Sequence, residues 1–260
     1  MKADHEQLNR EIKQREGAEQ VLRERLQFER LLSEVSARFV NVPLERVDSE
    51  IEKSLRQIRD FFKVDRCALI RLLPGKESWQ ITHLAVAEDM PEVPVGVELS
   101  VSTHPWAYHK LIEKREIVSV TNLDDLPPEA NVDKQTWIEW GIRSTLSIPI
   151  LIVERVGHAI TFNSVRSQMI WQVELFPRLQ LLGEIFVNTM ERKEIRLEIR
   201  ERLRFEGLIS NLSASFVNLP PDEVDAEINR GLRSITEFFD ADRCTMGFFS
   251  EDGTLLARGF

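Results

Sequence analysis

The stretch of sequence that decides the fold is Gly141-Ile142-Arg143-Ser144-Thr145-Leu146-Ser147-Ile148-Pro149-Ile150, with Val156-Gly157-His158-Ala159-Ile160-Thr161-Phe162 close behind it. Each half is a short run rich in apolar and β-branched residues, which is typical of a strand. We therefore predict two consecutive strands, at 145–153 and 156–163. The short connection between them predicts a hairpin.

The chain before this hairpin changes from helical to strand periodicity. Apolar residues at four-residue steps predict a helix over 6–40, whose thin apolar stripe is typical of a coiled-coil linker, and a second amphipathic helix over 47–62. A first hairpin is predicted over 66–86, with a turn at Pro74-Gly75. The segment from Met90 to Pro105 shows no sustained period and is expected to be a long loop. The remaining predictions are a short helix at 106–114, a strand at 117–120 and a second short helix at 132–140.

One long helix is predicted after the second hairpin. Its apolar pattern begins near Trp171 and its stripe runs from Leu175 to Met190. Pro177 favours either a true start near Phe176 or a kink, because a proline beyond the first turn costs about 3 kcal/mol. No glycine or proline follows Met190 until Gly207. The helix should therefore continue past the domain, and at about 1.5 Å per residue the part from 178 to 207 would extend roughly 45 Å.

The order of these elements and the quoted hairpin resemble the GAF domain family. The resemblance lies in a Gly-x-Arg-Ser-x-Leu-x-x-Pro strand followed by a Gly-x-x-x-x-Phe strand, and in the opening from Phe28 to Pro43, which is similar to GAF modules of bacterial sensor histidine kinases. One departure is Glu154-Arg155 in the hairpin turn, where family members often carry a glycine pair. The resemblance implies an α+β fold with an antiparallel sheet flanked by helices, a ligand cavity between one sheet face and the short helices, and dimerisation through the terminal helices.

The chain also contains an internal repeat. Residues 24–67 recur without a gap as 201–244, with 25 of 44 positions identical. A period of this length indicates a copied domain rather than a solenoid repeat. We expect a linker helix at 1–23, a GAF-like sensory domain at 24–193, and a linker helix with the truncated start of a second GAF-like domain at 194–260.

Composition excludes several classes of function. A net charge of -9 argues against a nucleic-acid partner, because phosphate binding needs a basic surface. No apolar run approaches the roughly 20 residues of a membrane span. There is no signal peptide pattern, and the two cysteines occupy equivalent repeat positions, so a reduced, cytoplasmic protein is expected. No phosphate-binding glycine loop or other catalytic motif is present, and these 260 residues are not expected to form an enzyme.

Aromatic and small polar residues are the candidates for a ligand pocket, because such pockets combine an apolar lining with a few polar groups. The candidate residues are Trp79, Thr82, His83, Trp106, Trp137, Trp140, Ser144, Thr145 and Thr161. The alternative is that these aromatic side chains only pack beneath the long loop. The sequence does not identify a cofactor.

Other chemistry known in the family is poorly supported. The histidines lack the spacing of a metal site, and no metal ligand is assigned. Cys67 has no neighbouring histidine of the kind expected beside a bilin attached to cysteine, and its recurrence as Cys244 is explained by a small buried core residue. Asn163-Ser164 stands where a cyclic-nucleotide motif would begin, but the lysine of that motif is missing.

Three hypotheses for function remain at this point. The first is a non-catalytic sensory module of a bacterial two-component signalling protein, a histidine kinase, in which a ligand or partner is read out through the continuous helix. The second is a structural dimerisation scaffold with a pocket filled by its own side chains. The third is a thiol-based redox sensor centred on Cys67.

Overall fold

The computed structural model describes residues 2–73, 75–90, 93–152, 155–249 and 255–257. The chain divides into two compact units, at 1–191 and 192–260, which are described separately below. None of the described helices combines the length and the apolarity needed to cross a membrane.

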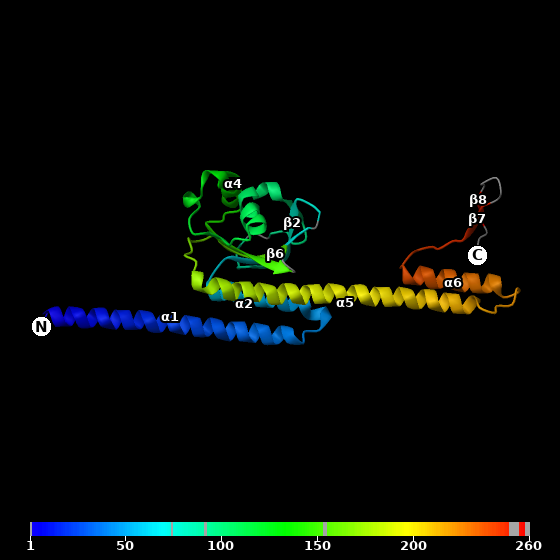
Figure 1. The fold of residues 1–260 in the computed structure, drawn as a ribbon, viewed down its shortest axis with the longest axis horizontal. Helices are drawn as coiled ribbons and strands as arrows, with labels where there is room; N and C mark the ends of the chain where they lie inside the picture. The colour runs from blue at the N-terminus through cyan, green and yellow to red at the C-terminus, as the bar shows by residue number, and fades with distance from the viewer. Residues whose placement is uncertain (1, 74, 91–92, 153–154, 250–254, 258–260) are drawn as a thin grey trace. The chain divides into compact units, whose positions relative to one another are not determined.

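Unit 1 is built on a six-stranded antiparallel sheet with the strand order β3-β2-β1-β6-β5-β4 (Figure 1). The strands are β1 (Arg66–Leu72), β2 (Ser78–Val86), β3 (Glu98–Ser100), β4 (Val118–Val120), β5 (Ser144–Ile152) and β6 (Arg155–Ser164). The two predicted hairpins are therefore present as β1-β2 and β5-β6, and they meet through the pairing of β1 with β6. Residues 153–154 lie outside the described residues, so the effect of Glu154-Arg155 in place of the family's glycine pair on the turn type is not tested.

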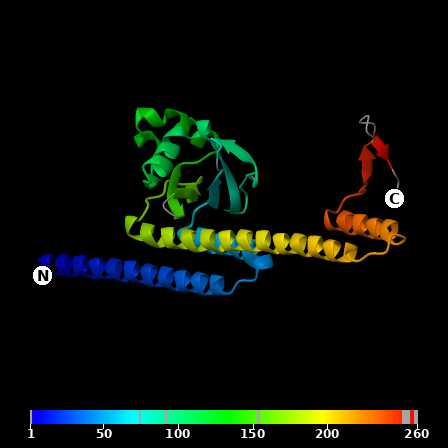
Figure 2. The same cartoon turned by 45° about the vertical axis from the view of Figure 1, so that its right-hand side comes forward.

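Helices cover both faces of this sheet (Figures 1 and 2). The long helices lie on one face and are α1 (Lys2–Val40), α2 (Val47–Phe62) and the first part of α5 (Phe176–Phe216). The short helices lie on the other face and are α3 (Pro105–Tyr108), the π-helical turn η3 (His109–Glu113) and α4 (Asn131–Glu139). Short 3-10 turns connect the elements and are η1 (Leu44–Arg46), η2 (Val101–Thr103), η4 (Leu123–Asp125), η5 (Pro128–Ala130) and η6 (Val173–Leu175). The predicted α+β fold with a flanked antiparallel sheet is confirmed.

The main core lies between the sheet and the long helices. Phe28 of α1 is fully buried, and its ring centroid lies 5.2 Å from that of Phe61 and 5.4 Å from that of Phe62 on α2. The residue after α2, Lys63, has a φ of 54°, a left-handed conformation that ends the helix. Burial of this aromatic trio holds the helical layer on one face of the sheet and leaves the other face for a second, smaller cluster.

One segment differs from its prediction. The expected loop at 90–105 contains a short strand, β3, whose residues pair with the edge strand β2 from Ser78↔Ser100 to Gln80↔Glu98. Three residues are too few to give a periodic signal. The strand exists because the edge of the sheet offers unpaired backbone groups.

The predicted long helix is confirmed as α5, one helix of 41 residues. It begins at Phe176 after a 3-10 turn, so Pro177 sits in the first turn, where its missing N–H is tolerated. Gly183 brings α5 against β5: a Cβ at this position would lie 2.4 Å from Cδ1 and 2.9 Å from Cγ1 of Ile150. Only a residue without a side chain allows this approach of helix to sheet.

Unit 2 contains the remainder of α5, helix α6 (Val224–Phe238) and two short paired strands, β7 (Gly247–Phe249) and β8 (Leu255–Ala257). Phe205, Phe238 and Phe239 form an aromatic trio with centroid distances of 5.8, 6.4 and 5.0 Å. These are the positions that correspond, in the sequence repeat, to the trio of unit 1. Phe205 is 42% exposed, whereas Phe28 is fully buried.

Candidate functional site

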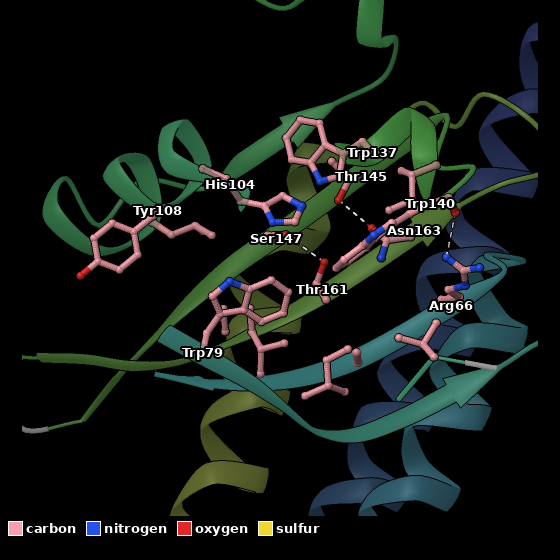
Figure 3. Close-up of a pocket in the computed structure, with 18 of the residues that line it drawn as sticks. Arg66, Trp79, His104, Tyr108, Trp137, Trp140, Thr145, Ser147, Thr161 and Asn163 are labelled. Atoms are coloured by element: carbon pink, nitrogen blue, oxygen red, sulfur yellow. Dashed lines mark hydrogen bonds between the residues drawn. The ribbon is translucent and has the colours of Figure 1, made fainter. Parts of the chain in front are cut away.

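A cavity of about 100 Å³ lies in unit 1 between the outer face of the sheet and the short helices (Figure 3). Strands β1, β2, β5 and β6 form its floor, and residues of α3, η3 and α4 form its roof. One water molecule needs roughly 10–15 Å³ on this measure. The space therefore suits several waters or one small ligand.

Strand register arranges the floor of the cavity in rows. Residues directly opposite in an antiparallel pair share a face, with Cβ atoms about 4.5–5.5 Å apart. The paired rows, from the polar end to the apolar end, are Arg66–Asn163–Thr145, Ala68–Thr161–Ser147 and Ile70–Ala159. The floor thus changes from cationic and polar to apolar along the strands.

Two hydrogen bonds cross the floor between β5 and β6. Thr145 Oγ1 donates to Asn163 Oδ1 at 2.7 Å, and the hydroxyls of Ser147 and Thr161 lie 2.9 Å apart. Because the Asn163 carbonyl is used in this way, its side-chain amide Nδ2 remains a donor, and no described residue accepts from it. The Nδ2 group is therefore available to a ligand.

Arg66 is a buried cation at the polar end of the cavity. It is 5% exposed, its Nη1 donates to the carbonyl oxygen of Trp140 at 3.1 Å, and its Nε has no hydrogen-bond partner among the described residues. Burial lowers the pKa of the Arg66 guanidinium below its ordinary value, and the charge of Asp65 offsets this only in part. Asp65 itself pairs with Arg166 and accepts from two backbone N–H groups, at Val165 and Arg166.

An aromatic cluster centred on His104 forms the roof. Its ring centroid lies 5.5 Å from that of Trp79, 5.9 Å from that of Trp137 and 5.2 Å from that of Trp140. Figure 3 shows Tyr108 and Arg66 at opposite ends of the site, with Trp79 and His104 between them. A flat apolar ligand would meet ring faces and edges here.

The protonation of His104 follows from its neighbours. The hydroxyl of Thr103 donates to the carbonyl of Ser100 at 2.8 Å, so its oxygen accepts from His104 Nδ1, which lies 2.9 Å away. Burial lowers the pKa of His104 to about 4, which keeps the ring neutral near pH 7. The remaining ring nitrogen, Nε2, is then a hydrogen-bond acceptor.

Asp133 holds the roof in place. Its carboxylate on α4 is fully buried and accepts from the backbone N–H groups of Trp106 and Ala107, at 3.1 and 2.9 Å. These groups belong to the first turn of α3, where N–H groups lack helical partners. The carboxylate therefore ties α3 to α4, although burial is the larger influence and raises the pKa of Asp133.

The structure places five of the candidate residues at the cavity and four elsewhere. Trp79, Trp137, Trp140, Thr145 and Thr161 line it. Trp106 is not among the lining residues and packs on Trp137 with a centroid distance of 6.5 Å. The others that lie away from the cavity are Thr82, His83 and Ser144.

A β-bulge explains two of these departures. Simple alternation along β2 would put Trp79, Ile81 and His83 on one face, but the register shifts opposite Leu69 and leaves Thr82 unpaired. The Thr82 hydroxyl donates to the Leu69 carbonyl, and His83 turns to the helical face, with its Nε2 3.5 Å from Asp48 Oδ1.

Ser144 is separated from the cavity by strand alternation, because it precedes Thr145, which faces the floor. Its hydroxyl donates to the carbonyl of Thr121 and accepts from the N–H of Met169, at 2.6 and 2.8 Å. It ties β5 to the neighbouring segments instead.

Sequence reasoning did not assign Arg66, His104, Ser147 and Asn163 to the pocket. Period-two alternation from Thr145 and Thr161 could have indicated Ser147 and Asn163. No local signal indicates Arg66, because an arginine at the start of a strand is usually exposed.

Cys67 lies away from the cavity. It is fully buried in the core cluster on the helical side of the sheet, and burial raises the pKa of its thiol. Within the described ranges, no group of three histidine, cysteine or acidic side chains comes together as a metal site.

Solved structures with the GAF fold are similar to this chain. The phycocyanobilin-bound GAF domain of a cyanobacterial phytochrome matches with a TM-score of 0.54 and 15% identity, over 65% of this chain and 96% of that domain. The blue-light absorbing PixJ GAF domain of Thermosynechococcus elongatus matches with a TM-score of 0.50 and 15% identity, over 64% of this chain and 98% of that one.

A longer match extends over both units. The photosensory core module of Stigmatella aurantiaca phytochrome matches with a TM-score of 0.62 and 14% identity over 90% of this chain, which spans 49% of that module. No protein-family model and no curated protein sequence matches the chain. At these identities the likeness concerns the fold, and unit 1 has the GAF fold.

Proposed function

We propose that this chain is a non-catalytic sensory module of a bacterial two-component signalling protein, a histidine kinase, in which a small molecule in the cavity biases the long helix α5. A ligand shifts a conformational equilibrium only when it binds one state better than the other. The module therefore needs a site for the ligand and an element that differs between the two states.

The position of the cavity relative to α5 carries this proposal. Both lie on β5, on opposite faces: Ser147 faces the cavity, and Ile150 contacts α5 at Gly183. A ligand that changes the hydrogen bond between Ser147 and Thr161, or the twist of β5, acts on a strand that supports α5 directly. Closely packed contacts transmit such shifts because they cannot deform smoothly.

The cavity also favours a ligand over a purely structural role. A pocket filled by its own side chains would support a scaffold, whereas this one retains about 100 Å³ of space, a donor on Asn163 and an unpartnered Nε on Arg66. Buried polar groups without partners are uncommon in folded proteins.

Covalent bilin binding through Cys67 is not favoured. The cyanobacterial GAF domain described above is bound to phycocyanobilin. In this chain, Cys67 lies in the core on the opposite face of the sheet from the cavity, so its thiol cannot reach a molecule there. Its burial equally disfavours the thiol-sensor hypothesis, because only an accessible thiolate reacts readily.

Native mass spectrometry of the purified chain tests the first half of the proposal. A retained small molecule is expected, and its loss should follow from Thr161→Trp, which fills the cavity from the floor. A protein that retains nothing and binds no small molecule in a screen would contradict a sensory role for this cavity.

Insertion of one residue after Glu194 tests the relay. The chain would be fused through its second unit to a histidine-kinase core, and the insertion rotates everything downstream by about 100°. We expect a changed ligand response, whereas a seven-residue insertion, which rotates the helix by only about 20° from its original direction, should preserve it. Equal responses in both variants would remove α5 from the mechanism.

A homodimer through the terminal helices is a second element of the proposal. Ile195, Ile199 and Leu203 are exposed at four-residue steps on α5, which is the spacing of a helix-pairing face. Sedimentation of the wild type and of Ile199→Glu separates the possibilities. Dissociation of the variant supports the dimer, and a monomeric wild type would contradict it.

A further inference from the structure

We infer that the cavity takes a small, single-ring aromatic carboxylate, with the carboxylate at Arg66 and Asn163 and the ring against the cluster of Trp79, His104 and Trp140. This inference rests on the proposed function, because it names the class of ligand that the sensory site would read. It is carried by charge, by the position of the donors and by the size of the cavity.

Arg66 is a buried cation whose charge Asp65 offsets only in part. Arg66 is 5% exposed and makes no ion pair within 4 Å among the described residues, while its neighbour Asp65 is already occupied by Arg166 and two backbone N–H groups. A buried guanidinium is costly unless an anion accompanies it. The buried Nε–H of Arg66 also has no hydrogen-bond acceptor among the described residues.

The second argument is the arrangement of donors. Arg66 and Asn163 are directly opposite on β1 and β6, so their side chains leave neighbouring positions on the cavity face. Of the Arg66 donors, Nη1 bonds to the Trp140 carbonyl and Nε is enclosed by protein atoms, which leaves Nη2. Neither Arg66 Nη2 nor Asn163 Nδ2 donates to a described residue. Two donors on one side of the cavity match the two oxygens of a carboxylate, with which an arginine forms strong charge-assisted hydrogen bonds.

The third argument concerns the remainder of the ligand. Beyond the row of Arg66 and Asn163 the floor carries Ala68 beside the hydroxyls of Thr161 and Ser147, which bond to each other, and then Ile70. The aromatic cluster around His104 lies against this part of the cavity. A flat ligand ring can pack against the cavity-facing side of this cluster, since aromatic rings attract one another in offset or edge-to-face arrangements. Pockets for drug-sized ligands measure roughly 300–1,000 Å³, whereas this cavity measures about 100 Å³. The ligand is therefore a single ring with a short acid group.

Direct binding measurements test the ligand class with three probes: benzoate, its neutral counterpart benzamide, and the non-aromatic acid cyclohexanecarboxylate. Calorimetry gives the affinity, and tryptophan fluorescence reports on the cavity, because three of the five tryptophans line it. We expect benzoate to bind about 10- to 100-fold more tightly than benzamide, the usual effect of a charge-assisted hydrogen bond. Cyclohexanecarboxylate should bind more weakly than benzoate.

Arg66→Met removes the charge and keeps most of the side-chain volume. It should abolish the preference for benzoate over benzamide while leaving benzamide affinity unchanged, which shows that the cavity remains intact. The ligand-free variant should melt no lower than the wild type, because it no longer buries an unpaired cation. Arg243→Met is the matched control: Arg243 occupies the equivalent repeat position but is exposed, so its loss should change neither binding nor melting.

The outcomes separate the ligand class from the proposed function. Equal affinity for benzoate and benzamide, or a preference that survives Arg66→Met, overturns the aromatic-carboxylate inference. Neither result contradicts the proposal that the cavity binds a small molecule. Absence of binding by all three probes also overturns the inference. In that case a different molecule found by native mass spectrometry preserves the proposed function, and an empty cavity without any ligand removes both.

Discussion

Replacing Gly183 with alanine should force α5 and β5 apart, because a methyl group there has no space. Its Cβ would lie 2.4 Å from Ile150 Cδ1 and 3.5 Å from Ile160 Cγ2, and carbon atoms pack best at about 3.5–4.0 Å. Ile150 is fully buried, so its side chain has little room to turn aside. Overpacking of this kind costs about 1–3 kcal/mol, whereas alanine gains up to about 1 kcal/mol over glycine in a helix. The net expectation is a destabilisation of about 0–2 kcal/mol.

Urea unfolding followed by tryptophan fluorescence measures this loss, since all five tryptophans lie between residues 79 and 171, within unit 1. Ile150→Val removes the Cδ1 atom that clashes and by itself should cost about 0.5–1.5 kcal/mol. The double variant should then be more stable than the sum of the two single changes predicts, by about 1 kcal/mol. Gly207→Ala is the control on the same helix, with no atom within 4 Å of the added methyl group.

Additive effects within about 0.5 kcal/mol would show that the two side chains do not interact. A Gly183→Ala protein that gains stability in unit 1 would show that the helix and strand are not in close contact. Either result would remove the contact on which the proposed relay depends.

Three further predictions concern titration, the roof and the thiols. Burial lowers the pKa of both His104 and His158 to about 4 in the folded protein. In the unfolded chain these imidazoles have a pKa near 6.5, so the unfolded state binds more protons than the folded state between about pH 6.5 and 4, and stability should fall with decreasing pH by up to about 1.4 kcal/mol per pH unit for each imidazole. The free energy of unfolding of His104→Gln and of His158→Gln should show a shallower dependence on pH across this range. An unchanged slope would contradict the burial of these histidines. Asp133→Ala should destabilise unit 1 by about 1–3 kcal/mol, because it leaves the buried N–H of Ala107 and the half-buried N–H of Trp106 without their acceptor. A loss within error in urea unfolding would argue against this tie. A thiol reagent should label Cys244 in the native chain and Cys67 only after unfolding, and rapid native labelling of Cys67 would reopen the redox hypothesis.

Local sequence pattern predicts some of the residues at the cavity and misplaces others. Trp137 and Trp140 are predicted for the pocket as aromatic residues on a short helix expected to line or cap it, and the structure brings them to the cavity. Thr82 and His83 are both pocket candidates by residue type, but the bulge at Thr82 turns His83 to the helical face. A bulge depends on the pairing of two strands, so a single strand carries little sign of it.

Residues whose roles depend on partners far away in the chain are the hardest to predict from the sequence. Asp133 is an unremarkable acidic residue on a short helix until α3 places two N–H groups against it. Arg66 stands at the start of a strand, where an arginine would normally be solvated, and only the fold buries it at the cavity. Neither role follows from neighbours in the chain.

The sequence by itself determined the two hairpins, the amphipathic helix before them and the existence of the long helix after them, because helical and strand periodicity act within a few residues. The structure chose the start of that helix at Phe176 over a kink at Pro177. Tertiary structure decided which face each strand turns to the cavity, the existence of β3 at the sheet edge, and the meeting of Arg66 with Asn163. These features depend on register and on contacts between segments far apart in the chain. Their free energy comes from burial and pairing that no single segment can provide.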